Sequence, residues 1–135
     1  MGDEPSAVRV LKSKSFQRFA RRCGIDDASL LDAVQRAERG LIDADLGSGV
    51  IKQRIARSGQ GKSGGFRAIV FFRRGTRAVF VHGFEKSSQS NVEAWELKQF
   101  RTAARIVLDL ADTEISRALD AGVYLEVQKG RKSDA

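Results

Sequence analysis

Three short runs rich in β-branched and aromatic residues lie in the middle of the chain and predict an antiparallel sheet. They cover residues 50–55, 66–72 and 78–84. Segments 59–65 and 73–75 separate the runs and have the glycine-rich or polar composition of turns. Both alternating faces of the second run are largely apolar, a pattern typical of a central strand that other elements cover. We therefore expect three strands joined as a meander.

Helical spacing of apolar residues predicts two helices before this sheet. The first follows Ser13 or Ser15, either of which has the side chain of an N-cap residue, and it ends at Gly24. The second begins at an aspartate pair and ends at Gly40. The apolar residues at helical spacing are Phe16, Phe19, Cys23, Leu30, Leu31, Val34 and Ala37. By this spacing Cys23 belongs to the core.

Two more helices and a strand are predicted after the sheet. Ser90 and Glu93 have the spacing of a capping box, which marks the start of a helix. Its apolar stripe consists of Leu97, Phe100, Ala104, Val107, Leu108 and Ala111. A shorter helix over residues 113–121 ends at Gly122. The residues that predict a short edge strand after it are Tyr124, Leu125 and Val127.

The order helix, helix, three strands, helix, helix and strand indicates one compact α+β domain. The whole chain, residues 1–135, has the length of a single domain, with a core over about residues 10–127. No apolar run approaches the roughly 20 residues that span a bilayer. The first ten residues lack the apolar centre of an export signal, and the single cysteine allows no intrachain disulfide. We therefore expect a cytoplasmic protein with no membrane partner.

The positive charge of the chain is concentrated in its middle. The sequence contains 24 lysine and arginine residues against 17 aspartate and glutamate residues, a formal net charge of +7. No acidic residue occurs between Leu46 and Phe84. The cations of this stretch are Lys52, Arg54, Arg57, Lys62, Arg67, Arg73, Arg74 and Arg77. Without a carboxylate nearby in the sequence, they favour a polyanionic partner over the alternative of a solvated sheet surface.

Residues 56–63 resemble a phosphate-binding loop but lack its context. They read Ala-Arg-Ser-Gly-Gln-Gly-Lys-Ser, a relaxed form of the nucleotide-binding pattern. A loop of that kind opens a helix, whereas residues 66–72 have the composition of a strand. We expect instead a glycine-rich hairpin loop that presents Lys62 to an anion. The alternative is a simple turn with a solvated lysine.

The side chains available for chemistry are mainly lysines and arginines. His82 is the only histidine and Cys23 the only cysteine, so a His/Cys metal site is not expected. His82 lies in a predicted strand, where we expect a packed or hydrogen-bonded role. Cations suffice for attack of an RNA 2′-hydroxyl on its adjacent phosphate, since positioning and charge neutralisation carry most of that step. DNA lacks this hydroxyl, so such a site favours RNA and requires no metal or cofactor.

Several segments resemble the RelE/HigB superfamily of bacterial toxins. The matching segments are residues 40–47, 50–55, 59–67 and 80–86. The string Gly-Lys-Ser-Gly-Gly-Phe-Arg at 61–67 is the most specific part and favours the HigB-like branch. The resemblance implies a RelE-like domain that acts as the toxin of a type II toxin–antitoxin pair. It also implies an endoribonuclease that cuts mRNA on the ribosome, and an antitoxin partner that often has a helix-turn-helix DNA-binding region.

The resemblance and the charge pattern together suggest site residues. The positions that match catalytic residues of the family are Lys52, Arg54, Arg67 and Lys86. The RNA-binding candidates are Lys62, which matches the lysine of the glycine loop, and Arg57, Arg73 and Arg74. Glu85 is the carboxylate nearest to Lys86 in the sequence and is a candidate base.

Two departures from the family pattern leave other functions open. Close relatives have lysine, asparagine and glutamate where residues 86–88 read Lys-Ser-Ser. The RelE tyrosine downstream of this segment has no counterpart, because the region offers Asn91 and Trp95, and Tyr124 lies far along the chain. One alternative is a relative that binds RNA or the ribosome without cleavage. The other is a ParE-like inhibitor of a DNA topoisomerase, although the retained cations favour the ribonuclease.

Overall fold

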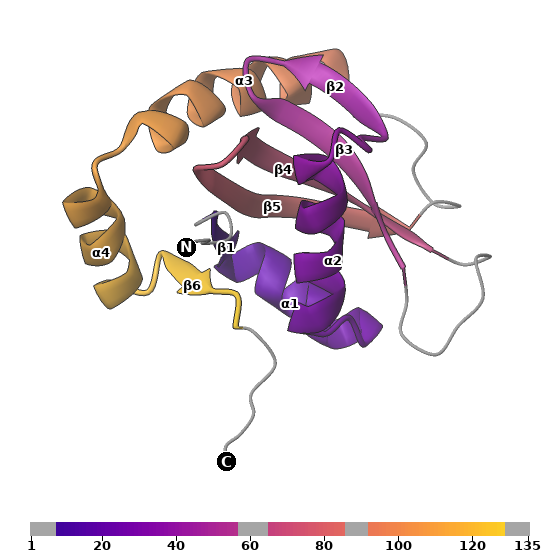
Figure 1. Ribbon diagram of the computed structural model, residues 1–135, viewed down its shortest axis with the longest axis horizontal. Coiled ribbons are helices and arrows are strands. Elements are labelled where there is room, and N and C mark those ends of the chain that lie inside the picture. The colour runs from indigo at the N-terminus through magenta and orange to yellow at the C-terminus, as the bar shows by residue number, and fades with distance from the viewer. Residues whose placement is uncertain (1–7, 57–64, 86–91, 129–135) are drawn as a thin grey trace.

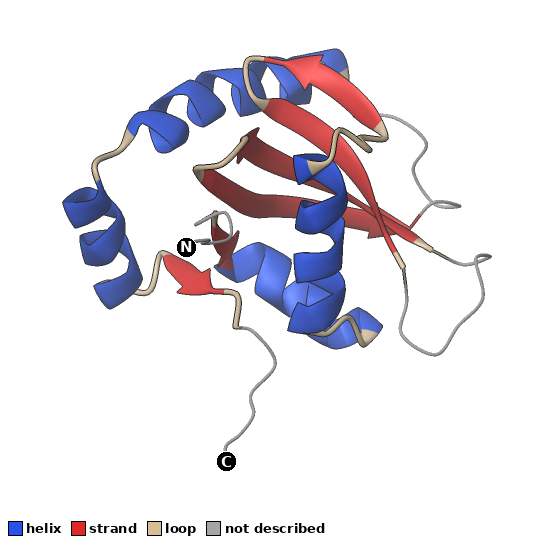
Figure 2. Ribbon diagram, viewed as in Figure 1, coloured by secondary structure: helices blue, strands red, loops and turns tan. Residues whose placement is uncertain are grey.

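The computed structural model describes residues 8–56, 65–85 and 92–128. Within these residues the chain forms four helices and a six-stranded sheet (Figures 1 and 2). In chain order the elements are β1 (Arg9–Ser13), α1 (Lys14–Cys23), α2 (Asp27–Glu38), β2 (Ala44–Gly47), β3 (Val50–Ile55), β4 (Phe66–Arg73), β5 (Arg77–Glu85), α3 (Ala94–Asp109), α4 (Asp112–Asp120) and β6 (Tyr124–Glu126). This architecture is the α+β domain that the sequence predicts. In the part described, no helix is both long and apolar enough to cross a membrane.

The sheet has the strand order β2-β3-β4-β5-β1-β6. Strands β2 to β5 form an antiparallel meander, which confirms the three predicted strands. β1 pairs in parallel with β5 and antiparallel with β6, the predicted edge strand. The sequence predicted neither β1 nor β2, and the first described element is a strand rather than a helix. Both strands are short, and β1 depends on partners far along the chain, so local spacing does not reveal them.

The helices lie around the sheet (Figure 1), and each face of the sheet has its own core. On one face, α1 and α2 cover residues of the meander that include Phe66 and Val70 of β4. On the other face, α3 and α4 cover residues that include Ile69 and Phe71 of the same strand. β4 is therefore buried from both sides, as its apolar alternation predicts.

Side-chain caps explain where the first two helices begin. Of the two predicted candidates, Ser13 is the N-cap of α1, and its hydroxyl accepts a hydrogen bond from the backbone N–H of Phe16 at 3.1 Å. Asp26 caps α2 in the same way, accepting from the backbone N–H of Ser29 at 3.0 Å. Both helices therefore begin where a side chain accepts a hydrogen bond from a backbone N–H group that has no partner within the helix.

The start and end of α3 differ from the prediction. Its N-cap is Glu93, whose backbone N–H donates to the carboxylate of Glu96 at 3.0 Å in a capping box. Ser90, the predicted partner of Glu93, lies outside the described residues. The helix ends at Asp109, and Ala111, predicted as part of its apolar stripe, is instead the exposed N-cap of α4.

Helix α1 packs against β5 at a glycine. A side-chain carbon at Gly83 would lie 2.3 Å from the ring of Phe19, so this close approach requires glycine. Phe19 also contacts Phe66 edge to face, with ring centroids 5.8 Å apart. Cys23 packs against the same core as a half-buried side chain, in agreement with its predicted position. These contacts fix the C-terminal half of α1 to the end of the sheet where β4 begins.

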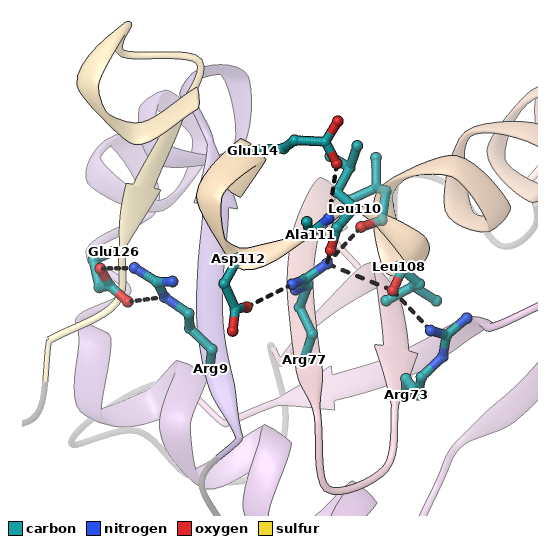
Figure 3. A network of polar contacts seen from close by, with 10 residues as sticks. Arg9, Arg73, Arg77, Leu108, Leu110, Ala111, Asp112, Glu114 and Glu126 are labelled. Carbon is teal, nitrogen blue, oxygen red and sulfur yellow. Dashed lines mark hydrogen bonds and ion pairs between the residues drawn. The ribbon is translucent and has the colours of Figure 1, made fainter. Parts of the chain in front are cut away.

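Arg77 joins the start of β5 to the corner between α3 and α4 (Figure 3). The residue is 3% exposed. Its Nη1 donates to the carbonyl oxygens of Val107 and Leu110, each at 2.9 Å, and its Nη2 lies 3.1 Å from the carboxylate of Asp112. The last carbonyl groups of a helix lack partners within the helix, and Arg77 supplies donors for them.

Candidate active site

Three of the predicted catalytic cations lie at one end of the sheet. Lys52 and Arg54 alternate with residues of β3 that face α1 and α2, so both lie on the opposite face. Arg67 shares that face on β4, and the strand register places it directly opposite Arg54. On its other side, Arg67 is opposite Phe84 of β5. The register therefore brings Lys52, Arg54 and Arg67 onto one surface.

Asp43 holds the Arg67 side chain. The Nε atom of Arg67 lies 3.1 Å from Oδ2 of Asp43, and the two side chains are 12% and 31% exposed. A guanidinium group has five N–H donors, so an ion pair at Nε leaves donors for an anionic ligand. Arg67 is therefore a positioned cation. Asp43 was not among the predicted site residues, although it falls within the matching segment 40–47.

The buried amide of Gln53 fixes the backbone that carries Asp43. Gln53 is 1% exposed. Its Nε2 donates to the carbonyl oxygens of Ala33 and Leu41 at 2.9 and 3.0 Å, and its Oε1 accepts from the backbone N–H of Asp43 at 3.1 Å. All three partners are backbone groups, so Gln53 ties α2 and the chain before β2 to β3. Gln53 thereby helps to position the partner of Arg67.

A groove opens beside this segment, next to the last residues of β3. Its volume is about 390 Å³, and Leu41, which is 57% exposed, contributes to its wall. Arg36 lines the α2 side, where its Nη2 donates to the carbonyl oxygen of Arg54 at 2.7 Å. Asp43 and Arg54 also line the groove, so it borders the cationic surface.

His82 packs between two phenylalanine rings on the face that α3 covers. The centroid of its ring lies 5.9 Å from that of Phe84 and 6.0 Å from that of Phe100. This confirms the packed role predicted for the histidine. Its Nε2 is buried and has no hydrogen-bond partner among the described residues. Within the same residues, no group of three or more His, Cys, Asp or Glu side chains is arranged to hold a metal ion.

The structure describes only some of the other predicted site residues. Those outside the described residues are Arg57, Lys62 and Lys86. Arg73 and Arg74 lie at the opposite end of β4, about 20 Å along the strand from Arg67. Glu85 is exposed at the end of β5, opposite Phe66.

Several cations of the acid-free stretch are paired with carboxylates from outside it. The pairs are Arg67–Asp43, Arg73–Asp109 and Arg77–Asp112, with N–O distances of 3.1, 2.8 and 3.1 Å. The expectation that these cations lack counter-ions was therefore wrong for these three, because folding brings together aspartates that are distant in sequence. Lys52 and Arg54 form no ion pair within the described residues.

The segment that resembles a phosphate-binding loop is flanked by strands. β3 ends at Ile55, and β4 begins at Phe66. Residues 57–64 between them lie outside the described residues. A strand directly after the glycines agrees with the prediction that this segment does not open a nucleotide-binding helix.

Tyr124 lies apart from the cationic surface. It belongs to β6, which is separated from β5 by β1. Burial raises the pKa of the Tyr124 hydroxyl above its usual value, so the side chain stays protonated at neutral pH. The position agrees with the prediction that Tyr124 does not stand in for a catalytic tyrosine near the end of β5.

Comparison with family models identifies the family of this domain. The model described as the RelE toxin of the RelE/RelB toxin–antitoxin system matches residues 8–127. The chain belongs to the RelE toxin family. A RelE toxin has a cognate antitoxin as its partner, and toxins of this family are generally endoribonucleases that inhibit translation. No curated protein matched the chain.

The matched range also covers the two strands that were not predicted from the sequence. Every strand and helix from β1 to β6 lies within residues 8–127. Strands β1 and β2 are therefore parts of the RelE domain. In this RelE toxin, Arg54 and Arg67 face each other in one row of the β3–β4 ladder, and Lys52 lies two residues from Arg54 on the same face. Asp43 pairs with Arg67.

Proposed function

We propose that this RelE toxin is an endoribonuclease that cuts mRNA on the ribosome by 2′-hydroxyl attack, without a metal ion or cofactor. The observation that carries the proposal is the convergence of Lys52, Arg54 and Arg67 on one face at one end of the sheet. Such a surface supplies the positive charge that a phosphate requires as it is attacked. The string at residues 61–67 supports placement in the HigB-like branch.

The proposed reaction transfers the phosphate within the RNA strand. The 2′-oxygen forms a bond to the adjacent phosphorus, and the bond from phosphorus to the 5′-oxygen of the next nucleotide breaks. The proton of the 2′-hydroxyl passes to a base, and a proton is delivered to the departing 5′-oxygen. The products are a 2′,3′-cyclic phosphate, which water opens to a 3′-phosphate, and a 5′-hydroxyl end. The step involves no oxidation and no co-reactant.

Each cation has a proposed role in this step. Arg67, oriented by Asp43, holds the phosphate oxygens with its remaining donors as their charge grows. Arg54 adds a second positive charge from the neighbouring strand, and half-buried Lys52 transfers a proton. Lys86 binds the phosphate or carries a proton. The residues proposed to contact the flanking RNA are Arg57, Lys62, Arg73 and Arg74.

A translating bacterial extract tests the proposal. The purified toxin should cut a reporter mRNA and leave 2′,3′-cyclic or 3′-phosphate ends together with 5′-hydroxyl ends. Arg54→Gln should slow cleavage at least tenfold, because one of the converging cations is lost. Lys98→Gln removes an exposed cation of α3 instead and should leave the rate unchanged. Intact mRNA in the presence of soluble, folded toxin would refute the proposal.

The same material separates the two alternatives. Toxin that sediments with ribosomes while the mRNA stays intact would identify a binding relative without nuclease activity. Inhibition of a purified topoisomerase on supercoiled DNA, again with intact mRNA, would identify a ParE-like inhibitor. In bacteria, induction of the toxin should stop growth, and co-expression of the neighbouring reading frame should restore it if that frame encodes the antitoxin.

A further inference from the structure

Helix α1 has a continuous cationic face. Its four basic residues, Lys14, Arg18, Arg21 and Arg22, are all exposed. At about 100° per residue, their positions fall within an arc of about 100°. The opposite side of the helix is buried against the sheet through Phe16, Phe19 and Ala20. We call these four cations the α1 stripe; it extends about 12 Å along the helix.

The α1 stripe has no counter-ions among the described residues. Helix α1 contains no acidic residue. Unlike Arg67, Arg73 and Arg77, none of the four cations forms an ion pair with a described carboxylate. Arg22 makes one described contact, with its guanidinium carbon 5.9 Å from the centroid of the Phe19 ring. Folding has therefore paired Arg67, Arg73 and Arg77 of the sheet but not the arginines of α1.

The stability of the helix does not account for this arrangement. Like charges four residues apart, such as Lys14 with Arg18 and Arg18 with Arg22, repel each other. Lys14 is the first residue of the helix, where the helix dipole disfavours a cation. Two of the four residues lie in the last turn, where the dipole favours them. Helix stability therefore favours the two cations of the last turn but does not explain the stripe as a whole.

The α1 stripe approaches the candidate active site at one end. Phe19 contacts Phe66, the residue next to Arg67, and packs directly on Gly83 of β5. Arg22, over the Phe19 ring, therefore lies near the end of the sheet that carries the converging cations. From there α1 runs along the sheet together with α2 (Figure 1). This face of the sheet is opposite the face of Arg54 and Arg67.

We propose that the α1 stripe is a second RNA-binding surface, which holds the sugar–phosphate backbone of RNA outside the nucleotide that is cut. This inference rests on the proposed function for the choice of RNA. Four cations spaced along one helix face match a string of phosphates, which bind lysine and arginine without regard to base sequence. The stripe adds affinity and orientation, while the converging cations act on the bond that breaks.

Two features favour RNA over a protein or membrane partner. Protein interfaces depend on apolar or aromatic anchors. Among the described residues, the exposed large apolar side chains are Leu41, Trp95, Ile106 and Val123, and none of these belongs to α1. A helix that binds a membrane surface inserts its apolar face, whereas the apolar face of α1 is buried in the core. The charge of the stripe is therefore its main recognition feature.

RNA binding is measured with a fluorescent 2′-O-methyl oligouridylate, which lacks the attacking hydroxyl and so reports binding alone. The test variant is Arg18→Gln/Arg21→Gln. The control is Lys98→Gln/Arg117→Gln, which removes two exposed cations from α3 and α4. At about 0.1 M salt the test variant should bind about 20-fold more weakly, and its salt slope should fall by about 1.4, because two phosphate contacts are lost. The control should bind like the parent.

The possible outcomes separate this inference from the proposed function. Weakened binding with an unchanged unfolding midpoint supports the stripe, whether or not the extract cleaves mRNA. Equal affinity for the test and control variants would overturn it. Binding of the parent to phosphatidylcholine–phosphatidylserine vesicles that requires Arg18 and Arg21, without such a requirement for RNA, would also overturn it and indicate a membrane surface.

Discussion

Arginines lie at both ends of the central sheet, in opposite surroundings. At the start of β4, Arg67 faces Arg54 across the ladder and contacts one carboxylate, that of Asp43. At the other end, Arg73 and Arg77 donate to backbone carbonyl oxygens of the last turn of α3 and contact aspartates of the α3–α4 corner (Figure 3). One end concentrates positive charge, and the other neutralises it.

The difference shows what distinguishes a structural arginine from a functional candidate. Both ends belong to the same acid-free stretch of sequence and have similar local composition. The deciding factor is the segment that folding brings to each end. At the Arg77 end it is the C-terminus of a helix, whose carbonyl groups require donors. At the Arg67 end, Asp43 orients one guanidinium, and Lys52 and Arg54 remain without an ion pair among the described residues.

The largest expected effect on stability is at the end of the sheet where Arg77 contacts the α3–α4 corner. Arg77→Gln should lower the free energy of unfolding by about 3–5 kcal/mol, because buried carbonyl groups of α3 and the Asp112 contact lose their partner. Chemical denaturation measures the change. Arg74→Gln, in the exposed turn nearby, should change stability by less than about 0.5 kcal/mol. Similar losses for both variants would contradict the structural role of Arg77.

An intermediate effect on stability is expected where α3 packs against the sheet. Phe100 of α3 contacts Phe71 and His82, with ring centroids 6.3 and 6.0 Å away. The side chain is half-buried, so Phe100→Ala should cost about 2–3 kcal/mol, less than the removal of a fully buried ring. Phe100→Leu should recover much of the loss. An unfolding midpoint unchanged in the alanine variant would show that α3 does not pack here.

The smallest expected change in stability is at the end of the sheet where Arg67 and Asp43 lie. Asp43→Asn should alter the free energy of unfolding by less than about 1 kcal/mol, as for a partly exposed ion pair. We expect cleavage to fall about tenfold, mainly in kcat, because Arg67 loses its orientation. Asp109→Asn removes the partner of Arg73 at the other end and should leave kcat unchanged. Equal kinetics for the two variants would remove the distinction between the ends.

The sequence predicted the elements whose spacing is local. The helices and the meander of β3, β4 and β5 follow from apolar periodicity and from turn or cap residues such as Gly24 and Ser13. β1 was not predicted, because its partners on β5 and β6 lie far along the chain. β2 was not predicted because it has four residues, and its backbone is fixed partly by Arg101 of α3, which donates to the carbonyl oxygen of Leu46.

The site was predictable in residue type but not in detail. The alternation along β3 and β4 suffices to place Lys52, Arg54 and Arg67 on one face once the strands are assigned. The roles of Asp43 and Gln53 depend on contacts between segments that no local pattern reveals. One signal was available for Gln53, since a polar residue at an inward position of a buried strand requires hydrogen-bond partners.

The most direct test compares the two ends in one assay. Cleavage of a reporter mRNA per folded molecule is measured for Arg67→Lys and Arg77→Lys, together with each unfolding midpoint. Lysine keeps the charge but loses the guanidinium fork. The account predicts that Arg67→Lys cleaves about 100-fold more slowly at a nearly unchanged midpoint, whereas Arg77→Lys has a lower midpoint and the parent rate. Parent-rate cleavage by Arg67→Lys, or a rate loss confined to Arg77→Lys, would contradict it.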